Sequence, residues 1–363
     1  MKSVRIRDSA GDPYYQQIKD SLRQQIVSGV LKAGASIPHE RALAESLQVS
    51  RKTTRRAILE LTHEGLLRRI RGRGTFVRDS VAPPSVSRGC VLVASQFSPF
   101  RSNYYGSILE GVYKAAQQSS TYIAFEYIVQ PYDVTLANIQ RHGMLKGIVA
   151  VGVSDPALLQ QFLRLKVPMV LVDSEQPADK PLFDMVTPDA ETGMYAAVNY
   201  LQELGHKEIV LLSAENVKGS MAGRVSGYRR AMKDARPRAL PERIVAASYC
   251  PEAAYAATTR ILNESNVPTA IVCVGDDFAV GAVEAVKDAG RKVPEDISVA
   301  GYGDLGAFTS PRLSTVRVPK EEMGSIAMRL LEMRRAHPAS PLQRIVLPVE
   351  WVSRGTCGVP RRR

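Results

Sequence analysis

Residues 38–77 read PHERALAESLQVSRKTTRRAILELTHEGLLRRIRGRGTFV, and this stretch decides the fold of the N-terminal part of the chain. Apolar residues recur at helical spacing in two neighbouring segments, with Leu43 and Leu47 in the first and Ile58 and Leu61 in the second. The pattern predicts two short helices that are joined by a turn and share one apolar core.

Positive charge marks the second helix and the hairpin after it. Ser50 is suited to cap this helix, whose first turn (residues 51–56) holds four cations, two threonines and no acid. A solvated basic face is the commoner meaning of such a run, but cations at a helix N-terminus oppose the macrodipole and therefore favour an external polyanion. Arginines also surround Gly72 and Gly74 in the predicted hairpin. A basic helix followed by a basic hairpin is typical of a winged helix-turn-helix that reads double-stranded DNA.

Motifs spread over residues 13–77 resemble the GntR-type DNA-binding domain. They are PYYQQI at 13–18, GVLKAG at 29–34, ERALA at 40–44, VSR at 49–51, EGL at 64–66 and GRGTFV at 72–77. We expect the DNA contacts to come from Arg41, Ser50, Arg51, Thr53, Arg55, Arg71, Arg73 and Gly74. Three positions depart from the pattern: His39 replaces a capping serine, Gln48 a glycine and Thr54 a valine. None of these changes removes a cation.

The charge distribution agrees with a DNA-binding head. The 363 residues carry a formal net charge of +12. Residues 1–88 hold 17 Lys and Arg against 8 Asp and Glu, a net charge of +9, and the remainder carries only +3. A small basic unit joined to a nearly neutral remainder is suited to binding a phosphate backbone.

The sequence disfavours several classes of protein and site. The four cysteines lack CxxC spacing and the five histidines lack ligand spacing, so we expect buried thiols and no metal site. No GxSxG, HExxH or P-loop pattern occurs, so we expect neither an enzyme nor a cofactor. The N-terminus has no signal-peptide core, and no run reaches the roughly 18 apolar residues of a membrane span. We therefore expect a cytoplasmic protein without a membrane partner.

From residue 89 onward, apolar strands alternate with helices. Continuous apolar runs such as 147–151 and 270–274 predict parallel strands that are buried on both faces of a sheet. About ten such strands are too many for one small sheet. The segment 173–189, rich in Pro and Asp, therefore indicates a crossing between two lobes. Ligands of such folds bind at the carboxyl ends of the strands, here across a cleft.

These patterns together give the expected organisation. The fold class is α/β, with a winged helix-turn-helix domain at 1–78 and a two-lobed core of parallel sheets at 89–363. Residues 79–88 contain Pro83-Pro84 and are expected to form a semi-extended linker.

The core resembles that of LacI-type regulators, which are relatives of periplasmic sugar-binding proteins. The motifs are LGHKEI at 204–209, Arg224 with Gly227-Tyr228, Asp276 with Ala279 and Gly281, and VPEDISVAGY at 293–302. The resemblance covers roughly residues 89–355 and implies a periplasmic-binding-protein-like fold. Together with the GntR-type head, it resembles the arabinose-repressor subgroup. It implies a homodimeric repressor that a small molecule, such as a sugar or sugar derivative, releases from operator DNA.

The resemblance also implies a set of ligand-binding residues. Lobe one would contribute Tyr104 and Tyr105, and lobe two would contribute Lys218, Ser220, Arg224, Tyr249 and Asp276. Alternatives remain for several of them, because either tyrosine could serve packing and Lys218 could simply be exposed. Asp276 could instead cap a helix beginning at Phe278.

Two departures bear on the ligand. Gly303 stands where the family has an aspartate, with Asp304 next to it, and Gly275 stands where it has an asparagine. Fewer acceptors on that side of the site disfavour a plain monosaccharide, and Lys218 with Arg224 would also suit a sugar acid or phosphate. The two alternative function classes are a GntR-headed fusion to an aminotransferase-like enzyme and a transport binding protein. The missing cofactor-lysine setting disfavours the first, and the DNA-binding head disfavours the second.

Overall fold

The computed structural model divides into two units, residues 1–88 and 89–363. It describes residues 13–27, 30–32, 34–63, 66–70, 73–78, 90–95, 103–119, 121–128, 130–141, 145–237, 240–306 and 309–361. The linker expected at 79–88 lies outside the described residues.

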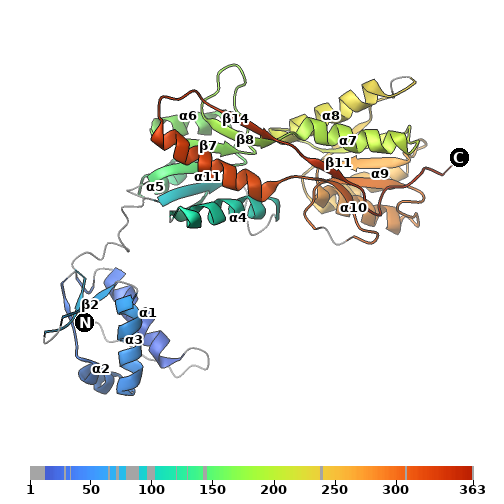
Figure 1. The fold of residues 1–363 in the computed structure, drawn as a ribbon. Helices are drawn as coiled ribbons and strands as arrows, with labels where there is room; N and C mark the ends of the chain where they lie inside the picture. The colour runs from blue at the N-terminus through green and yellow to red at the C-terminus, as the bar shows by residue number, and fades with distance from the viewer. Residues whose placement is uncertain are drawn as a thin grey trace. The chain divides into compact units, whose positions relative to one another are not determined.

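The N-terminal unit is a winged helix-turn-helix (Figure 1). Helix α3 (Arg51–His63) packs against both α1 (Tyr14–Val27) and α2 (Glu40–Leu47). The antiparallel sheet has the order β1 (Ser36–Ile37), β3 (Gly74–Val77), β2 (Leu67–Ile70). The hairpin predicted from the basic turn is confirmed, and its ends pair Leu67 with Val77 and Ile70 with Gly74.

Helical spacing of the apolar residues explains how this small unit obtains a core. Leu43, Ile58 and Leu61 are buried together with Ile18 and Leu22 of α1. Full burial of one such side chain contributes about 1.5–3 kcal/mol relative to exposure. The core therefore fixes how the three helices pack, while the polar faces of α2 and α3 stay in water.

The three departures from the GntR pattern have visible local consequences. His39 precedes α2 and makes no side-chain capping bond. Gln48 ends α2 in the left-handed conformation, with φ 53°, which glycine adopts without strain. Thr54 is buried, and its hydroxyl donates to the carbonyl oxygens of Glu40 (3.1 Å) and Arg51 (3.0 Å). This hydroxyl therefore ties α3 to α2.

The core unit contains two six-stranded sheets, one in each lobe. Lobe one has the order β14 (Arg344–Leu347), β8 (Asp184–Pro188), β7 (Met169–Val172), β6 (Leu145–Val151), β4 (Cys90–Ser95), β5 (Tyr122–Tyr127). Lobe two has the order β10 (Ile244–Ala247), β9 (Ile209–Ala214), β11 (Ala270–Cys273), β12 (Ser298–Gly303), β13 (Ser314–Arg317), β15 (Glu350–Val352). Every pairing is parallel except that of β13 with β15. The predicted two-lobed α/β fold is confirmed.

Helices flank each sheet in Figure 1. Lobe one carries α4 (Asn103–Gln118), α5 (Tyr132–Arg141), α6 (Pro156–Arg164) and α11 (Lys320–Ala336). Lobe two carries α7 (Ala190–Glu203), α8 (Ser220–Asp234), α9 (Pro251–Leu262) and α10 (Asp276–Asp288). The sequence pattern predicts a helix over 224–234, whereas α8 begins four residues earlier, at Ser220.

The chain crosses between the lobes three times. It passes from β8 to α7, returns from β13 to α11, and passes again from β14 to β15. The crossing predicted within 173–189 is present, but most of its second half is the strand β8, which the sequence did not indicate. Asp184 in this strand forms a buried ion pair with Arg334 of α11, with Oδ2 2.7 Å from Nε. A buried carboxylate in a short strand obscures the apolar pattern on which prediction depends.

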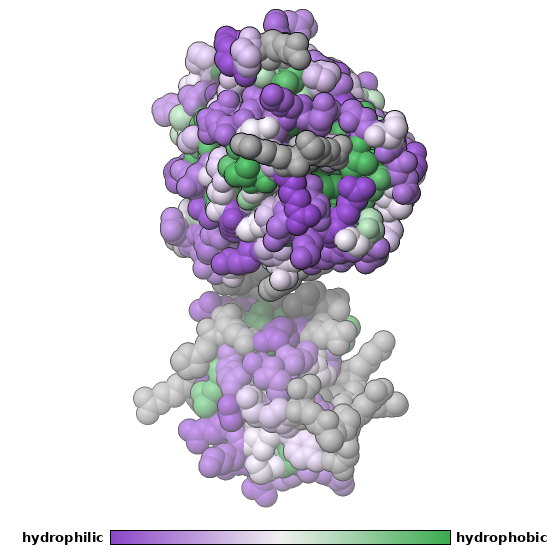
Figure 2. Space-filling view, turned by 90° about the vertical axis from the view of Figure 1, so that its right-hand side faces the viewer, coloured by the Kyte–Doolittle hydropathy of each residue, from purple (hydrophilic) through white to green (hydrophobic). Residues whose placement is uncertain are grey.

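The surface of the core is mainly hydrophilic on the side that Figure 2 shows. Hydrophilic side chains cover most of the face of the core shown in Figure 2, and apolar ones gather in small patches near its middle. No helix in the described part of the chain is both long and apolar enough to span a bilayer.

Candidate DNA-binding face and ligand cleft

The start of α3 is fixed by the residue that the sequence singled out as its cap. The Ser50 hydroxyl accepts a hydrogen bond from the backbone N–H of Thr53 (3.1 Å) and lies 2.7 Å from the Thr53 hydroxyl. Arg51 and Arg55, four residues apart on the same helix face, are both exposed. Two arginines and two hydroxyls are thus presented to solvent at one helix end, as a groove-reading helix requires.

One carboxylate orients part of this face. Glu40, whose side chain is only 12% exposed, lies 3.2 Å from Arg69 of β2 and 3.9 Å from Arg51. The acid therefore connects the first residue of α3 with the wing hairpin. Sequence reasoning missed this role, although Glu40 lies within the GntR-like segment at 40–44.

The other predicted DNA-binding residues also lie on the head. Arg41 is exposed and pairs with Glu45 one turn along α2 (3.1 Å). Arg73 is exposed in the wing turn, and Gly74 follows with φ 116°, in the region that favours glycine. Arg71 lies outside the described residues. DNA contact by any of these residues stays a prediction.

Arg224 is the best-anchored cation among the residues predicted to line the cleft between the lobes. It is 4% exposed, and its Nη1 donates to the Val274 carbonyl oxygen at 2.5 Å. Its Nη2 donates to the Ser220 hydroxyl at 3.2 Å, and its Cζ lies 4.1 Å from the ring centroid of Tyr302. These contacts fix the guanidinium before any ligand binds.

Four buried polar atoms in this region have no hydrogen-bond partner among the described residues. They are Tyr104 Oη and Asp173 Oδ1 from lobe one and Arg224 Nε and Tyr302 Oη from lobe two. Burial is the main cause that raises the pKa of the Tyr104 phenol, and the Asp173 carboxylate is the second. The two side chains are therefore close enough to interact electrostatically. An unsatisfied buried polar group costs about 1–3 kcal/mol. A ligand with matching donors and acceptors would remove that cost.

Asp173 was not among the residues predicted to bind the ligand. It follows the fully buried strand β7 directly and is itself 5% exposed, with φ 46°. Its place after an apolar run, at the carboxyl end of a strand, is the signal that could have identified it. Tyr105 contacts Tyr104 edge to face, with 5.2 Å between ring centroids, and Asp173 acts on the pKa of both phenols. Both predicted tyrosines therefore lie near Asp173 in lobe one.

Tyr249 of lobe two lies close enough to these groups for Arg224 and Asp173 to act on the pKa of its phenol. Its ring stacks on the buried Phe278, with centroids 5.0 Å apart and planes 27° apart, while 43% of the residue is exposed. Burial of the phenol raises the pKa of Tyr249 to about 12, and Arg224 acts in the opposite direction. The ring therefore has one covered face and a neighbouring cation.

Asp276 has a different role from the capping alternative. Helix α10 begins at Asp276 itself, with Gly275 at the N-cap, so the expectation that Asp276 caps a helix starting at Phe278 is wrong. Its Oδ1 accepts from the Thr315 hydroxyl (2.5 Å) and its Oδ2 from the Leu305 N–H (2.8 Å). Burial raises the pKa of its carboxyl. The residue thereby ties α10 to the segments that follow β12.

Lys218 is exposed and lies on the lobe-two side of the cleft rather than deep within it. The Tyr132 hydroxyl and the Ala157 N–H are the main causes that lower the pKa of Asp155 in lobe one, and Lys218 adds a smaller effect. Beside it, the Gly219 N–H donates to Glu175 Oε2 of lobe one at 3.0 Å. The lobes thus meet where acidic groups of lobe one face the N-terminus of α8.

The position where the family has an aspartate offers no carboxylate here. Gly303 has φ 131°, and Asp304 is held by Arg354 (2.7 Å) and Arg317 (2.8 Å). The buried Lys320 donates to the carbonyl oxygens of Gly303 and Asp304 and lies 5.8 Å from the Tyr104 ring centroid. Its burial lowers the pKa of the ammonium. Sequence reasoning did not identify Lys320, because the hydrogen bonds and the aromatic contact of its ammonium are all to residues distant in the chain.

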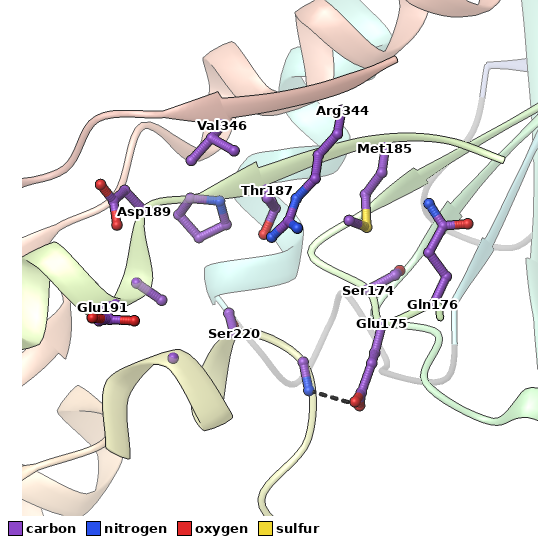
Figure 3. A pocket seen from close by; sticks show the side chains of 14 residues that line it. Ser174, Glu175, Gln176, Met185, Thr187, Asp189, Glu191, Ser220, Arg344 and Val346 are labelled. Carbon is purple, nitrogen blue, oxygen red and sulfur yellow. Dashed lines mark hydrogen bonds between the residues drawn. The ribbon is translucent and has the colours of Figure 1, made fainter. Parts of the chain in front are cut away.

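A separate cavity of about 300 Å³ lies on the flank of the interlobe region (Figure 3). Arg344 of β14 projects towards it, and the hydrogen bond between Glu175 and Gly219 lies at its edge. Ser220 lines both this cavity and the neighbourhood of Arg224. Within the described ranges, no three His, Cys, Asp or Glu side chains are grouped as metal ligands.

Comparison with known proteins gives two family matches. Residues 14–77 match the family of bacterial regulatory proteins known as the gntR family, and residues 198–357 match the periplasmic binding protein-like domain. The arabinose-repressor subgroup, by contrast, stays a prediction.

Curated relatives cover only part of the chain. It is 36% identical over 191 residues to the HTH-type transcriptional repressor PurR of Klebsiella pneumoniae, which covers 52% of this chain and 55% of that protein. The protein of the same name from Proteus mirabilis is 34% identical over 190 residues, again 52% and 55% of the two chains. The chain thus spans about half the length of the curated relatives it matches.

Solved structures share the fold of the core. A LacI family transcriptional regulator from Enterococcus faecium with bound ribose has a TM-score of 0.66 at 21% identity, over 74% of this chain and 99% of that one. A dimeric Lac repressor with an 11-residue C-terminal deletion has a TM-score of 0.66 at 22% identity, over 75% and 100%.

Proposed function

We propose that the chain is a transcriptional repressor in which a GntR-type winged helix-turn-helix head binds an operator and a LacI-type core releases it when a small molecule binds. The observation that carries the proposal is the interlobe cleft, where Arg224 Nε and Asp173 Oδ1 are buried without a hydrogen-bond partner in the described part of the chain. A cleft that closes on a ligand is a hinge device, and the head supplies the function that the hinge would control. Such a protein would work in the cytoplasm, where the operator DNA is.

The ligand that fits this cleft is uncharged and rich in hydroxyl groups. Arg224 Nε can only donate a hydrogen bond, and Asp173 Oδ1 as a carboxylate can only accept one. Neighbouring hydroxyls of a sugar supply both roles, whereas a deprotonated phosphate or carboxylate group placed next to Asp173 has no donor for it and is repelled by it. Arg224 and Asp173 carry charges of opposite sign on the two lobes, and the Asp173 carboxylate raises the pKa of the Arg224 guanidinium. We therefore favour a neutral sugar or sugar derivative over the sugar acid or phosphate that Lys218 and Arg224 alone would suit.

The working form is proposed to be a homodimer formed by the core. Strand β5 is the outer edge of the lobe-one sheet, and its Tyr122, Phe125 and Tyr127 are between 38% and 49% exposed. Tyr113 of α4 is 55% exposed. An exposed aromatic edge strand is a site where a second chain can pair. Residues 89–363 should sediment as a dimer and residues 1–80 as a monomer, and a monomeric core at micromolar concentration would contradict this assembly.

The decisive experiment measures operator affinity with and without a ligand. An operator would first be selected from random double-stranded DNA, and a thermal-shift screen of sugars, sugar acids and nucleosides would supply the effector. Arg224→Ala should abolish effector release and leave operator affinity unchanged, because Arg224 belongs to the cleft. Arg229→Ala is the matched control, since Arg229 lies on the same helix in an exposed pair with Glu242. Release of Arg224→Ala at the wild-type effector concentration would refute the cleft assignment.

The competing enzyme hypothesis has a simple optical test. An aminotransferase-like body would hold pyridoxal phosphate, which supplies visible absorbance when bound. We expect the purified protein to show no absorbance band at wavelengths longer than that of the protein itself. A visible band that borohydride reduction removes would favour the enzyme instead.

A further inference from the structure

Gly275 and Tyr249 share one small volume at the lobe-two wall of the cleft. A Cβ atom built on Gly275 would lie 2.2 Å from Tyr249 Oη, 3.2 Å from Cζ and 3.4 Å from Cε2. Two heavy atoms that are not bonded cannot approach to 2.2 Å, so any side chain at position 275 would require the phenol to move.

The backbone does not require glycine at this position. Gly275 has φ −159° and ψ 159°, which is extended conformation that any residue can adopt. The steric conflict with Tyr249 is therefore what an added side chain would meet. An Ala substitution can test the conflict without introducing backbone strain.

The Tyr249 ring has little freedom to retreat. One of its faces is stacked on Phe278, which is fully buried in α10. The carbonyl of Val274, the residue before Gly275, is held by Arg224 Nη1 at 2.5 Å. A side chain at 275 would consequently push the phenol away from Phe278 and towards solvent, where 43% of Tyr249 is already exposed.

We propose that Gly275 is a positioning residue for ligand specificity, because its missing side chain lets the Tyr249 ring lie flat along the lobe-two wall. The proposal rests on the proposed function, and it names what the wall offers: an aromatic face for the apolar side of a sugar ring and a phenol hydroxyl near Arg224. Stacking on an aromatic ring orients a ligand at little cost in side-chain entropy. Position 275 thus decides the width of the cleft through Tyr249 without touching the ligand.

A double-mutant cycle on the full chain tests the geometry without any ligand. Gly275→Ala should lower the urea midpoint, and the loss should largely disappear in a Tyr249→Phe background, because the atom at 2.2 Å is then absent. Gly290→Ala is the control, since nothing lies within 4 Å of a Cβ there and its effect should be the same with Tyr249 or Phe. Additive effects of Gly275→Ala and Tyr249→Phe would overturn the steric coupling.

Ligand binding tests the specificity itself, with D-ribose, L-arabinose and D-gluconate as probes. A probe that binds the wild type should bind Gly275→Ala at least about tenfold more weakly and should regain the affinity of Tyr249→Phe in the double variant. Equal affinity of wild type and Gly275→Ala would overturn the positioning role and leave the proposed function standing. If neither neutral sugar binds the wild type and gluconate does, the proposed ligand class fails, while the urea cycle still decides the geometry.

Discussion

The arginines of the head and Arg224 of the core differ in how exposed and how firmly held their guanidinium groups are. Arg51 at the start of α3 has a side chain that is 73% exposed and lies 3.9 Å from its nearest acidic partner. Arg224 is 4% exposed and has two hydrogen bonds and an aromatic ring around its guanidinium. The first can reorient towards phosphates or base edges, whereas the second is held in one orientation.

This difference decides how each region should respond to its surroundings. Exposed charges act over a distance that salt shortens, with a Debye length of about 10 Å at 0.1 M. Buried charges are screened much less, and their energy depends on fixed neighbours. Operator affinity should therefore fall steeply with salt, and effector affinity should change little.

The largest effect is expected from removing the head arginines. Arg51→Ala combined with Arg55→Ala should weaken operator binding by about 2–6 kcal/mol in total, since each base-reading arginine contributes about 1–3 kcal/mol. The salt slope should fall if either side chain contacts phosphate instead. Fluorescence anisotropy with labelled operator at several salt concentrations measures both. Unchanged affinity and slope would break the comparison, because the exposed arginines would then have no DNA role.

A smaller effect is expected from the contact between the lobes. Glu175→Gln keeps the acceptor for the Gly219 N–H but removes its charge at the N-terminus of α8. We expect effector binding to weaken by about 0.5–1 kcal/mol, because this contact between the lobes loses a charge–dipole attraction. Titration calorimetry measures the change, and Glu332→Gln, exposed on α11, is the control. Tighter binding would show that Glu175 opposes closure.

A change of opposite sign is expected in the head. Gln48→Gly should stabilise it by about 0.5–1 kcal/mol, because relief of the left-handed strain exceeds the entropy that glycine adds to the unfolded chain. Ser46→Gly, inside α2, should instead destabilise it by about 0.5 kcal/mol. Chemical denaturation followed by circular dichroism distinguishes the two. Destabilisation by both would mean that the strain at Gln48 is negligible.

The smallest expected effect is a pH dependence confined to the core. His206 is buried, with Nδ1 2.8 Å from the Thr269 hydroxyl and Nε2 2.8 Å from the Gly358 carbonyl, and burial lowers its pKa from the ordinary 6.5. The unfolded chain then takes up the proton first, so core stability should fall as pH drops below about 6.5. His206→Gln should reduce the dependence of the melting temperature of the core on pH below about pH 6.5. An unchanged slope would exclude His206 as its source.

The sequence predicted the elements whose pattern is local. Helical spacing indicated α2 and α3, and Ser50 indicated where α3 begins, because a cap and an apolar stripe are read within a few residues. Apolar runs such as 147–151 and 270–274 gave buried parallel strands for the same reason. The strand β8 escaped prediction, since its buried Asp184 has its partner, Arg334, 150 residues away.

The features of the candidate site also separate into those predicted from local sequence and those that only the tertiary structure shows. The sequence by itself determined that the chain carries a basic reading head and an α/β core, and motif resemblance pointed to Arg224 and Tyr104. Only the tertiary structure decided that Asp173 lies in the same cleft with an unpartnered oxygen, that Asp304 is occupied by two arginines, and that Tyr249 fills the space over Gly275. The physical reason is that charge and periodicity are properties of neighbours in the chain, whereas desolvation and steric exclusion depend on atoms that folding brings together.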